Sequence, residues 1–144
     1  MTGRSYTFSL HSALSHRMMR MMTQAKETGR LGEQVAAERL QSLGYHICGR
    51  NVRVGSRDEI DILAFDPKDQ VLVFAEVKTR SRTDRDFRPE LNMDQRKITA
   101  LRRAARLWVG EHEYDGGYRI DLLSVESGKV TRHLQQLSWE GQVT

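Results

Sequence analysis

Residues 58–78 read DEIDILAFDPKDQVLVFAEVK, and this stretch decides the fold. Two runs rich in β-forming residues, 58–65 and 71–78, flank a polar segment at 66–70 whose composition is typical of a turn. The pattern predicts a β-hairpin with a loop of about four or five residues. The rest of the chain is expected to be arranged around this hairpin.

The predicted hairpin brings two acidic residues together. If Phe65 faces Leu72 across the loop, antiparallel register places Asp61 opposite Glu76, with Cβ atoms about 4.5–5.5 Å apart. Lys78 lies beside Glu76, because residues two apart share one face of a strand. The acids continue an apolar face, so they lie at the edge of a core and need a compensating positive charge. A divalent cation is the simplest candidate, with Lys78 as a second positive neighbour.

Asp61 followed by Glu76-Val77-Lys78 resembles the acid…acid-x-Lys core of the restriction-endonuclease-like, or PD-(D/E)xK, nuclease superfamily. More closely, the chain resembles the bacterial YraN-like family, whose functional relatives are archaeal Holliday-junction resolvases. The resemblance covers most of the chain from about Thr28 onward. The segments that carry it are Gly32-Glu33, residues 59–64 (EIDILA), residues 74–80 (FAEVKTR) and Arg119-Ile120-Asp121.

The resemblance implies a catalytic set made of Asp61, Glu76, Lys78 and Glu33. Asp61, Glu76 and the backbone carbonyl of Val77 would hold Mg²⁺ or Mn²⁺ through oxygen ligands. Lys78 would lower the pKa of an attacking water or stabilise transition-state charge, and Glu33 would position a water. From the residues alone, a surface glutamate near a helix N-terminus is the better explanation of Glu33, and with the resemblance the two explanations are about even.

Periodicity and turn chemistry predict the other elements. Helices are expected at Gly29–Leu43 and from Asn92 to about His112, and further strands at 45–54, 118–125 and 130–137. This order predicts one α/β domain over residues 28–144, with the restriction-endonuclease-like three-layer fold and its mixed central β-sheet flanked by helices. The residues expected on the buried helix stripes are Leu31, Val35, Ala36, Leu40 and Leu43, then Ile98, Leu101, Ala105 and Trp108.

Residues 1–27 are predicted to be a basic N-terminal extension, disordered or partly helical and dispensable for folding. Residues 1–26 contain no Asp or Glu, and any of four methionines between positions 18 and 22 could be the true initiator. The composition also excludes several classes of protein. The single cysteine, Cys48, excludes a disulfide framework or thiolate zinc site and fits a reducing, cytoplasmic compartment. No apolar run is long enough for a membrane span.

The formal net charge is +4 although the predicted site concentrates acids, so basic residues are in excess elsewhere. That balance suits a polyanionic partner, expected to be nucleic acid and specifically DNA. Candidate contacts are Arg57 before the hairpin, Arg80 and Arg82 after it, and Gln95 and Lys97 at the start of the second helix. Ordinary solvated surface charges explain these cations equally well.

Three functions remain open from the sequence. The first is a metal-dependent nuclease, resolvase-like on branched DNA. The second is a non-catalytic nucleic-acid-binding module of the same fold. The third is a protein–protein adaptor in which Glu76 makes an ordinary surface salt bridge with Lys78 or Arg80. The resemblance also implies a homodimer, although no segment marks an interface. Asp121 is expected to be a structural acid that pairs with Arg119 or a base of the second helix.

Overall fold

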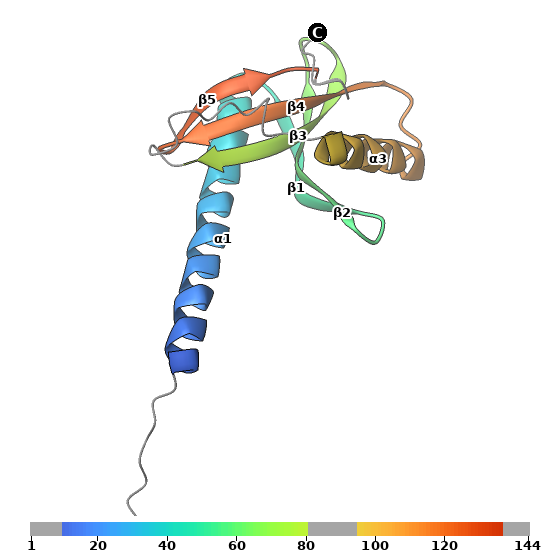
Figure 1. Ribbon diagram of the computed structural model, residues 1–144. Helices are drawn as coiled ribbons and strands as arrows, with labels where there is room; N and C mark the ends of the chain where they lie inside the picture. Colours follow the sequence, from blue (N-terminus) through green and yellow to red (C-terminus); the bar gives the residue numbers. More distant parts are fainter. Residues whose placement is uncertain (1–9, 81–94, 137–144) are drawn as a thin grey trace, which may run out of the picture.

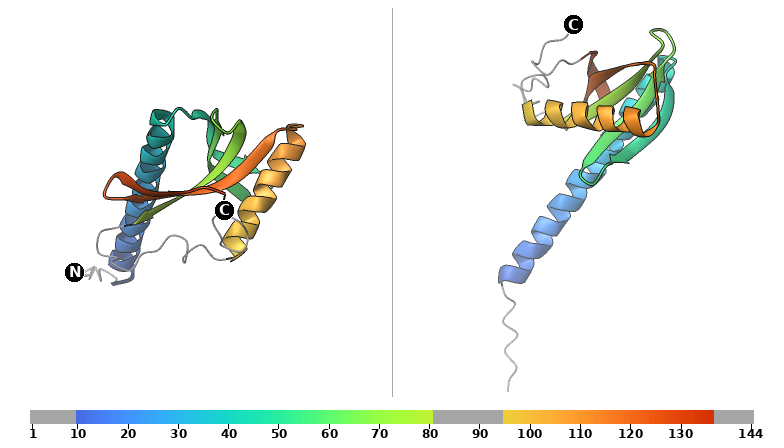
Figure 2. Two further views of the ribbon diagram at one scale, coloured as in Figure 1. Left: turned by 90° about the horizontal axis from the view of Figure 1, so that it is seen from above. Right: turned by 90° about the vertical axis from the view of Figure 1, so that its right-hand side faces the viewer.

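A mixed five-stranded sheet lies between two helices, as the predicted three-layer α/β fold requires (Figures 1 and 2). The computed structural model describes residues 10–80 and 95–136, with side chains from residue 16 onward and not at Gln95. Arg82 and Asn92, both singled out from the sequence, therefore lie outside the described residues. Within this part of the chain, no helix has the length and apolar character that a membrane span requires.

The strands follow one another across the sheet in chain order. All neighbours are antiparallel except β3 and β4, which are parallel because helix α3 forms the crossover between them. The strands are β1 (His46–Val54), β2 (Asp58–Asp66), β3 (Val71–Arg80), β4 (Gly117–Glu126) and β5 (Lys129–Leu134), and the helices are α1 (Leu10–Ser42) and α3 (Gln95–Glu111).

The predicted hairpin register is confirmed. Phe65 pairs with Leu72, and the β2–β3 ladder continues to the Ile62–Ala75 pair. Alternation along the strands then directs apolar side chains to both faces of the sheet. One core cluster includes Phe74 and lies under α3, and the other lies under α1. The polar turn therefore fixes which residues of the hairpin reach each face.

Helix α1 begins at Leu10, well before the predicted start at Gly29, and crosses the predicted domain boundary. Residues 10–28 contain neither proline nor glycine, and a single glycine costs a helix only about 1 kcal/mol, so Gly29 does not end it. The early part of α1 projects away from the sheet (Figure 1), and the four methionines at positions 18–22 are all more than 60% exposed.

The predicted buried stripe is correct for α3 and partly wrong for α1. Ile98, Leu101 and Ala105 are buried as predicted, and Trp108 packs against the same cluster. On α1, however, Leu31 is 64% and Leu43 is 49% exposed. The buried positions of α1 are Ala36, Ala37 and Leu40, with Val35 packed against them. The sheet covers only the middle of this stripe, so its two ends remain in solvent.

Gly32 permits the close approach of α1 to β3. A Cβ atom at this position would lie 1.9 Å from Thr79 Oγ1 and 3.2 Å from Thr79 Cβ, distances that require the neighbouring groups to move. This contact places the next residue, Glu33, beside the end of β3. The Gly32-Glu33 pair therefore combines close helix–sheet packing with an acidic side chain.

We expect Gly32→Ala to lower the free energy of unfolding by about 1–3 kcal/mol, because the added methyl group overpacks the α1–β3 contact. Gly29→Ala is the matched control in the same helix, since a Cβ there meets nothing within 4 Å. The control should be neutral or stabilising by up to about 1 kcal/mol. Urea unfolding measures both variants, and equal stability of the two would contradict the close-packing argument.

Candidate active site

Asp61 lies where the β2–β3 ladder ends. The last pair of the ladder is Ile62–Ala75, and Asp61 Oδ2 then accepts a hydrogen bond from the backbone N–H of Val77 at 2.9 Å. Ile60 belongs to the core cluster under α3, whereas Ile62 belongs to the cluster under α1. Residues two apart normally share a face of a strand, so the regular alternation of β2 is interrupted at Asp61. The hydrogen bond to Val77 directs the Asp61 carboxylate toward β3.

Glu76 is contacted by two lysines. Its side chain is 7% exposed, and Oε1 lies 2.8 Å from Lys97 Nζ and 3.4 Å from Lys78 Nζ. Burial and the neighbouring Lys97 lower the pKa of Lys78, against the attraction of Glu76. Burial alone would also lower the pKa of Lys97, but its hydrogen bonds to Glu76 and Lys78, together with attraction to Glu76 and Asp61, raise this pKa. The lysines from β3 and α3 thus share one carboxylate.

Three carboxyl groups influence one another at this position. Burial, followed by repulsion from Glu76, raises the pKa of Asp61 to about 7, although the Val77 N–H opposes the change. Burial also raises the pKa of Glu33, and Glu59 and Glu76 add to this effect while Asn51 and Arg50 oppose it. The Oε2 atom of Glu33 is buried and has no hydrogen-bond partner in the described part of the chain. The carboxylates therefore lack full charge compensation.

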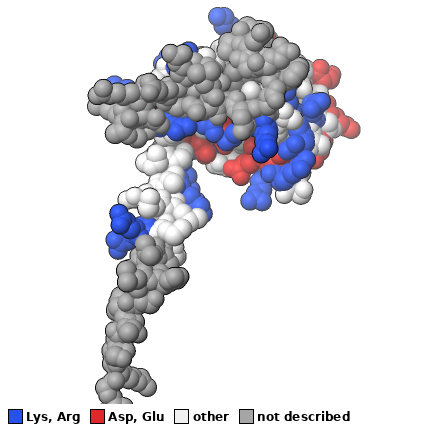
Figure 3. Space-filling model, viewed as in Figure 1, with Lys and Arg blue, Asp and Glu red and all other residues white. Residues whose placement is uncertain are grey.

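The structure brings the four predicted catalytic residues into one region, and their chemical roles stay predictions. Lys97, predicted as a nucleic-acid contact, forms an ion pair with Glu76 at 2.8 Å. Of the other candidate contacts, Arg57 is exposed in the turn before β2 and Arg80 is half-buried at the end of β3. Gln95 begins α3. Figure 3 shows acidic atoms bordered by Lys and Arg atoms on this face of the domain.

The sequence did not indicate that α3 also holds the start of β2. Arg103 Nε lies 2.8 Å from Asp58 Oδ2, and Arg103 Nη2 lies 2.7 Å from Oδ1. This bidentate ion pair lowers the pKa of Asp58, because Arg103 donates hydrogen bonds to its carboxylate. The only signal for it in the sequence was the excess of cations on α3, which did not identify a partner.

The donor set fits a hard divalent cation. Asp61 and Glu76 supply carboxylate oxygens from adjacent strands, and the unpartnered Oε2 of Glu33 marks a third oxygen nearby. Mg²⁺ and Mn²⁺ favour such oxygens and commonly use one or two carboxylates together with water. Within residues 10–80 and 95–136, no three His, Cys, Asp or Glu side chains are already gathered as a complete metal site. Any ion there would depend on two carboxylates and further oxygens.

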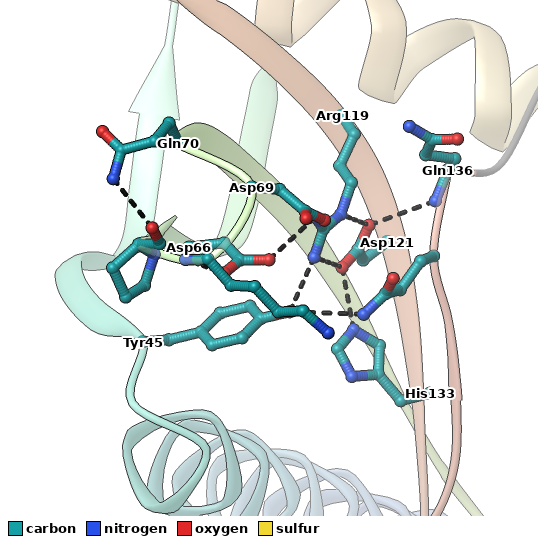
Figure 4. A network of polar contacts seen from close by, with 11 residues as sticks. Tyr45, Asp66, Asp69, Gln70, Arg119, Asp121, His133 and Gln136 are labelled. Atoms are coloured by element: carbon teal, nitrogen blue, oxygen red, sulfur yellow. Dashed lines mark hydrogen bonds and ion pairs between the residues drawn. The ribbon is translucent and has the colours of Figure 1, made fainter.

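Asp121 lies in a separate polar network with Arg119, as one of the predicted alternatives stated (Figure 4). Arg119 also donates to Asp66 at 2.9 Å and to the Tyr45 hydroxyl at 2.6 Å. His133 lies 2.8 Å from Asp121, whose side chain is completely buried. The network joins β2, β4, β5 and the residue before β1. Its charges are mutually satisfied, so we assign it a structural role.

The raised pKa of Asp61 predicts a pH-dependent stability in metal-free buffer. The folded protein holds this proton more tightly than the unfolded chain, whose aspartates titrate near 3.8. The resulting stability is fully present below about pH 4 and is lost as the pH rises through about 7. Relative to Asp61→Asn, the unfolding free energy of the wild type should fall by up to about 4 kcal/mol between these pH values. Urea unfolding in EDTA measures this difference, and parallel pH profiles for the two proteins would contradict it.

Comparison with known proteins identifies the family of this chain. Residues 32–125 match the model of "Uncharacterised protein family UPF0102". A UPF0102 protein of Mycobacterium sp. (strain KMS) is 39% identical over 102 residues, which cover 70% of this chain and 74% of the relative. One from Streptomyces coelicolor is 43% identical over 99 residues, covering 67% and 74%, respectively. One from Campylobacter fetus is 33% identical over 108 residues, covering 75% and 90%. The chain therefore belongs to the UPF0102 family, the YraN-like group of the PD-(D/E)xK nuclease-like proteins.

Proposed function

We propose that this protein is a metal-dependent nuclease that hydrolyses phosphodiester bonds in nucleic acid, with branched DNA as its substrate. The observation that carries the proposal is the meeting of Asp61, Glu76 and Lys78 at the end of one β-hairpin. Two acids and a lysine in this order are the groups that phosphodiester hydrolysis needs in a small space. The proposal goes beyond the family description, which names no activity.

Each side chain near the site would have its own role in the hydrolysis. Lys78, with a lowered pKa beside Glu76, would stabilise the negative charge that grows on the phosphoryl oxygens. Lys97 would bind a neighbouring oxygen of the same phosphate once it leaves Glu76. Glu33, whose Oε2 is unpartnered, would orient the attacking water. The exposed Arg57 and the half-buried Arg80 border the site and would bind the flanking strand.

Mg²⁺ or Mn²⁺ would be held by Asp61, Glu76 and the Val77 carbonyl. Bound there, the ion would neutralise charge on the phosphate and lower the pKa of the attacking water. Asp61 has a second role in this scheme, because its hydrogen bond to the Val77 N–H holds β2 against β3 at the site. The same bond fixes the direction of the carboxylate in the metal-free protein.

A second candidate function is a non-cutting nucleic-acid-binding module of the same fold. It is favoured by the contacts of Glu76 with both Lys78 and Lys97, which neutralise this acid without a metal ion. A simple adaptor with surface salt bridges fits less well. The Glu76 side chain is 7% exposed, and exposed ion pairs contribute little to stability, so burial of these charges calls for another use.

Metal binding should stabilise the wild type. A divalent ion would relieve the repulsion that raises the pKa of Asp61, so the melting temperature in about 5 mM Mg²⁺ or Mn²⁺ should exceed that in EDTA by several degrees. Asp61→Asn should abolish most of this shift, whereas Asp69→Asn, an exposed acid in the β2–β3 turn, should keep it. No shift for the wild type, or an equal shift for Asp61→Asn, would reject the metal site.

Cutting and binding should separate in a Glu76→Ala variant. We expect the wild type to cut four-way or flapped DNA in Mn²⁺, and Glu76→Ala to lose at least about 100-fold in rate while still binding. Linear duplex and the same structures in RNA are the comparison substrates. Binding without any cutting by the wild type would favour the non-cutting module instead.

A further inference from the structure

Two adjoining hollows open beside the candidate active site, at the turn between β1 and β2. One has a volume of about 160 Å³ and lies between the start of β2 and α3, next to Glu76 and Lys97. The other, of about 100 Å³, lies at the turn itself and includes Arg53 in its lining. Both are lined by Arg57, Asp58 and Glu59. A depression therefore leads from the acids of the site to the turn.

The acid in the wall of this depression is already neutralised. Both oxygens of Asp58 are bound by Arg103 of α3, at 2.7 and 2.8 Å, and the Asp58 side chain is only 8% exposed. A two-pronged guanidinium–carboxylate pair is among the stronger ionic contacts in proteins. Arg103 thus occupies both carboxylate oxygens of Asp58, and the charge of Arg57 adds to its effect in lowering the pKa of Asp58.

In this arrangement the neighbouring cation, Arg57, is left without an ion-pair partner in the part of the chain that the structure describes. Arg57 directly precedes Asp58 in the chain. Arg53 and Arg57 are both exposed, and neither forms an ion pair within the described residues. Without Arg103, Asp58 would be the nearest acid available to Arg57 and would repel an approaching anion. Glu59, another acid that lines both hollows, is exposed and lies opposite Arg53 in the β1–β2 register. The turn therefore keeps a net positive charge.

We propose that Arg53, Arg57 and the Gly55-Ser56 turn form a subsite for a backbone phosphate next to the one being cut, and that the Arg103–Asp58 pair keeps this subsite available. The ligand is a strand of nucleic acid, and in this respect the inference rests on the proposed function. Arg57 is the binding residue. Arg103 is a positioning residue, because it acts through Asp58 and not by touching the phosphate.

The DNA affinities of charge-removing variants test the subsite. The probe is a fluorescein-labelled four-way DNA junction in EDTA, titrated at several salt concentrations, with an unstructured DNA strand for comparison. Arg57→Gln should weaken binding about fivefold and reduce the salt slope by about one, as loss of one phosphate contact does. Arg39→Gln is the matched control, because it removes the same charge from the exposed end of α1, at the opposite end of β1 from the turn.

Combined substitutions test the role of the Arg103–Asp58 ion pair between α3 and β2. Arg103→Gln alone should weaken binding about fivefold or more, since it releases Asp58 to pair with Arg57. Adding Asp58→Asn should restore affinity to within about twofold of the wild type, although the ion pair is still absent. In the Arg57→Gln background, Arg103→Gln should have little further effect. Melting curves of each variant establish that it is folded, and Arg57→Gln tests the subsite even if Arg103→Gln unfolds.

Three results would overturn the inference. If Arg57→Gln binds like the wild type, or if no binding is detected at all, the subsite is rejected. If Arg103→Gln and the Asp58→Asn/Arg103→Gln double variant bind equally weakly, Arg103 does not act through Asp58. Cutting is a separate readout. If the variants show this pattern of affinities but the wild type does not cut DNA, the nuclease function is rejected and the subsite is supported. If the wild type cuts DNA but Arg57→Gln binds with unchanged affinity, the nuclease function is supported and the subsite is rejected.

Discussion

The repulsion between buried carboxylates at the end of one hairpin is the constraint on which the site depends. Asp61 and Glu76 come from adjacent strands, and burial together with repulsion from Glu76 raises the pKa of Asp61. The protein balances this cost with Lys78, Lys97 and the Val77 N–H. A region that holds several partly compensated charges is costly for stability, and such regions are where functional sites concentrate.

Helix α3 links this charge balance to the fold. Its apolar side, which includes Ile98 and Leu101, packs on the sheet and fixes the helix in place. The polar side then delivers Lys97 to Glu76 and Arg103 to Asp58. One rigid element therefore sets both the acid–lysine cluster and the wall of the adjoining depression. On the other side of the sheet, Gly32 allows α1 to approach closely enough to place Glu33 beside the same acids.

Local patterns predicted the hairpin because its information is local. Turn residues at 66–70 and alternating apolar residues fixed the Phe65–Leu72 register, and the convergence of Asp61, Glu76 and Lys78 followed. The exposure of Leu31 was predicted wrongly, because periodicity identifies an apolar stripe without showing how much of it the sheet covers. Likewise, a run of cations on α3 indicated a charged helix but not which acid each cation meets.

The amino-acid sequence was enough to predict the element order, the hairpin register and the pattern of two acids and a lysine at Asp61, Glu76 and Lys78. It could do so because neighbouring residues along a strand or turn carry these signals. The folded structure was needed to show that Ile60 and Ile62 enter different core clusters, that Lys97 reaches Glu76, and that Arg103 binds both oxygens of Asp58. These contacts join residues far apart in the chain, and packing of helices on the sheet, not local propensity, sets their distances.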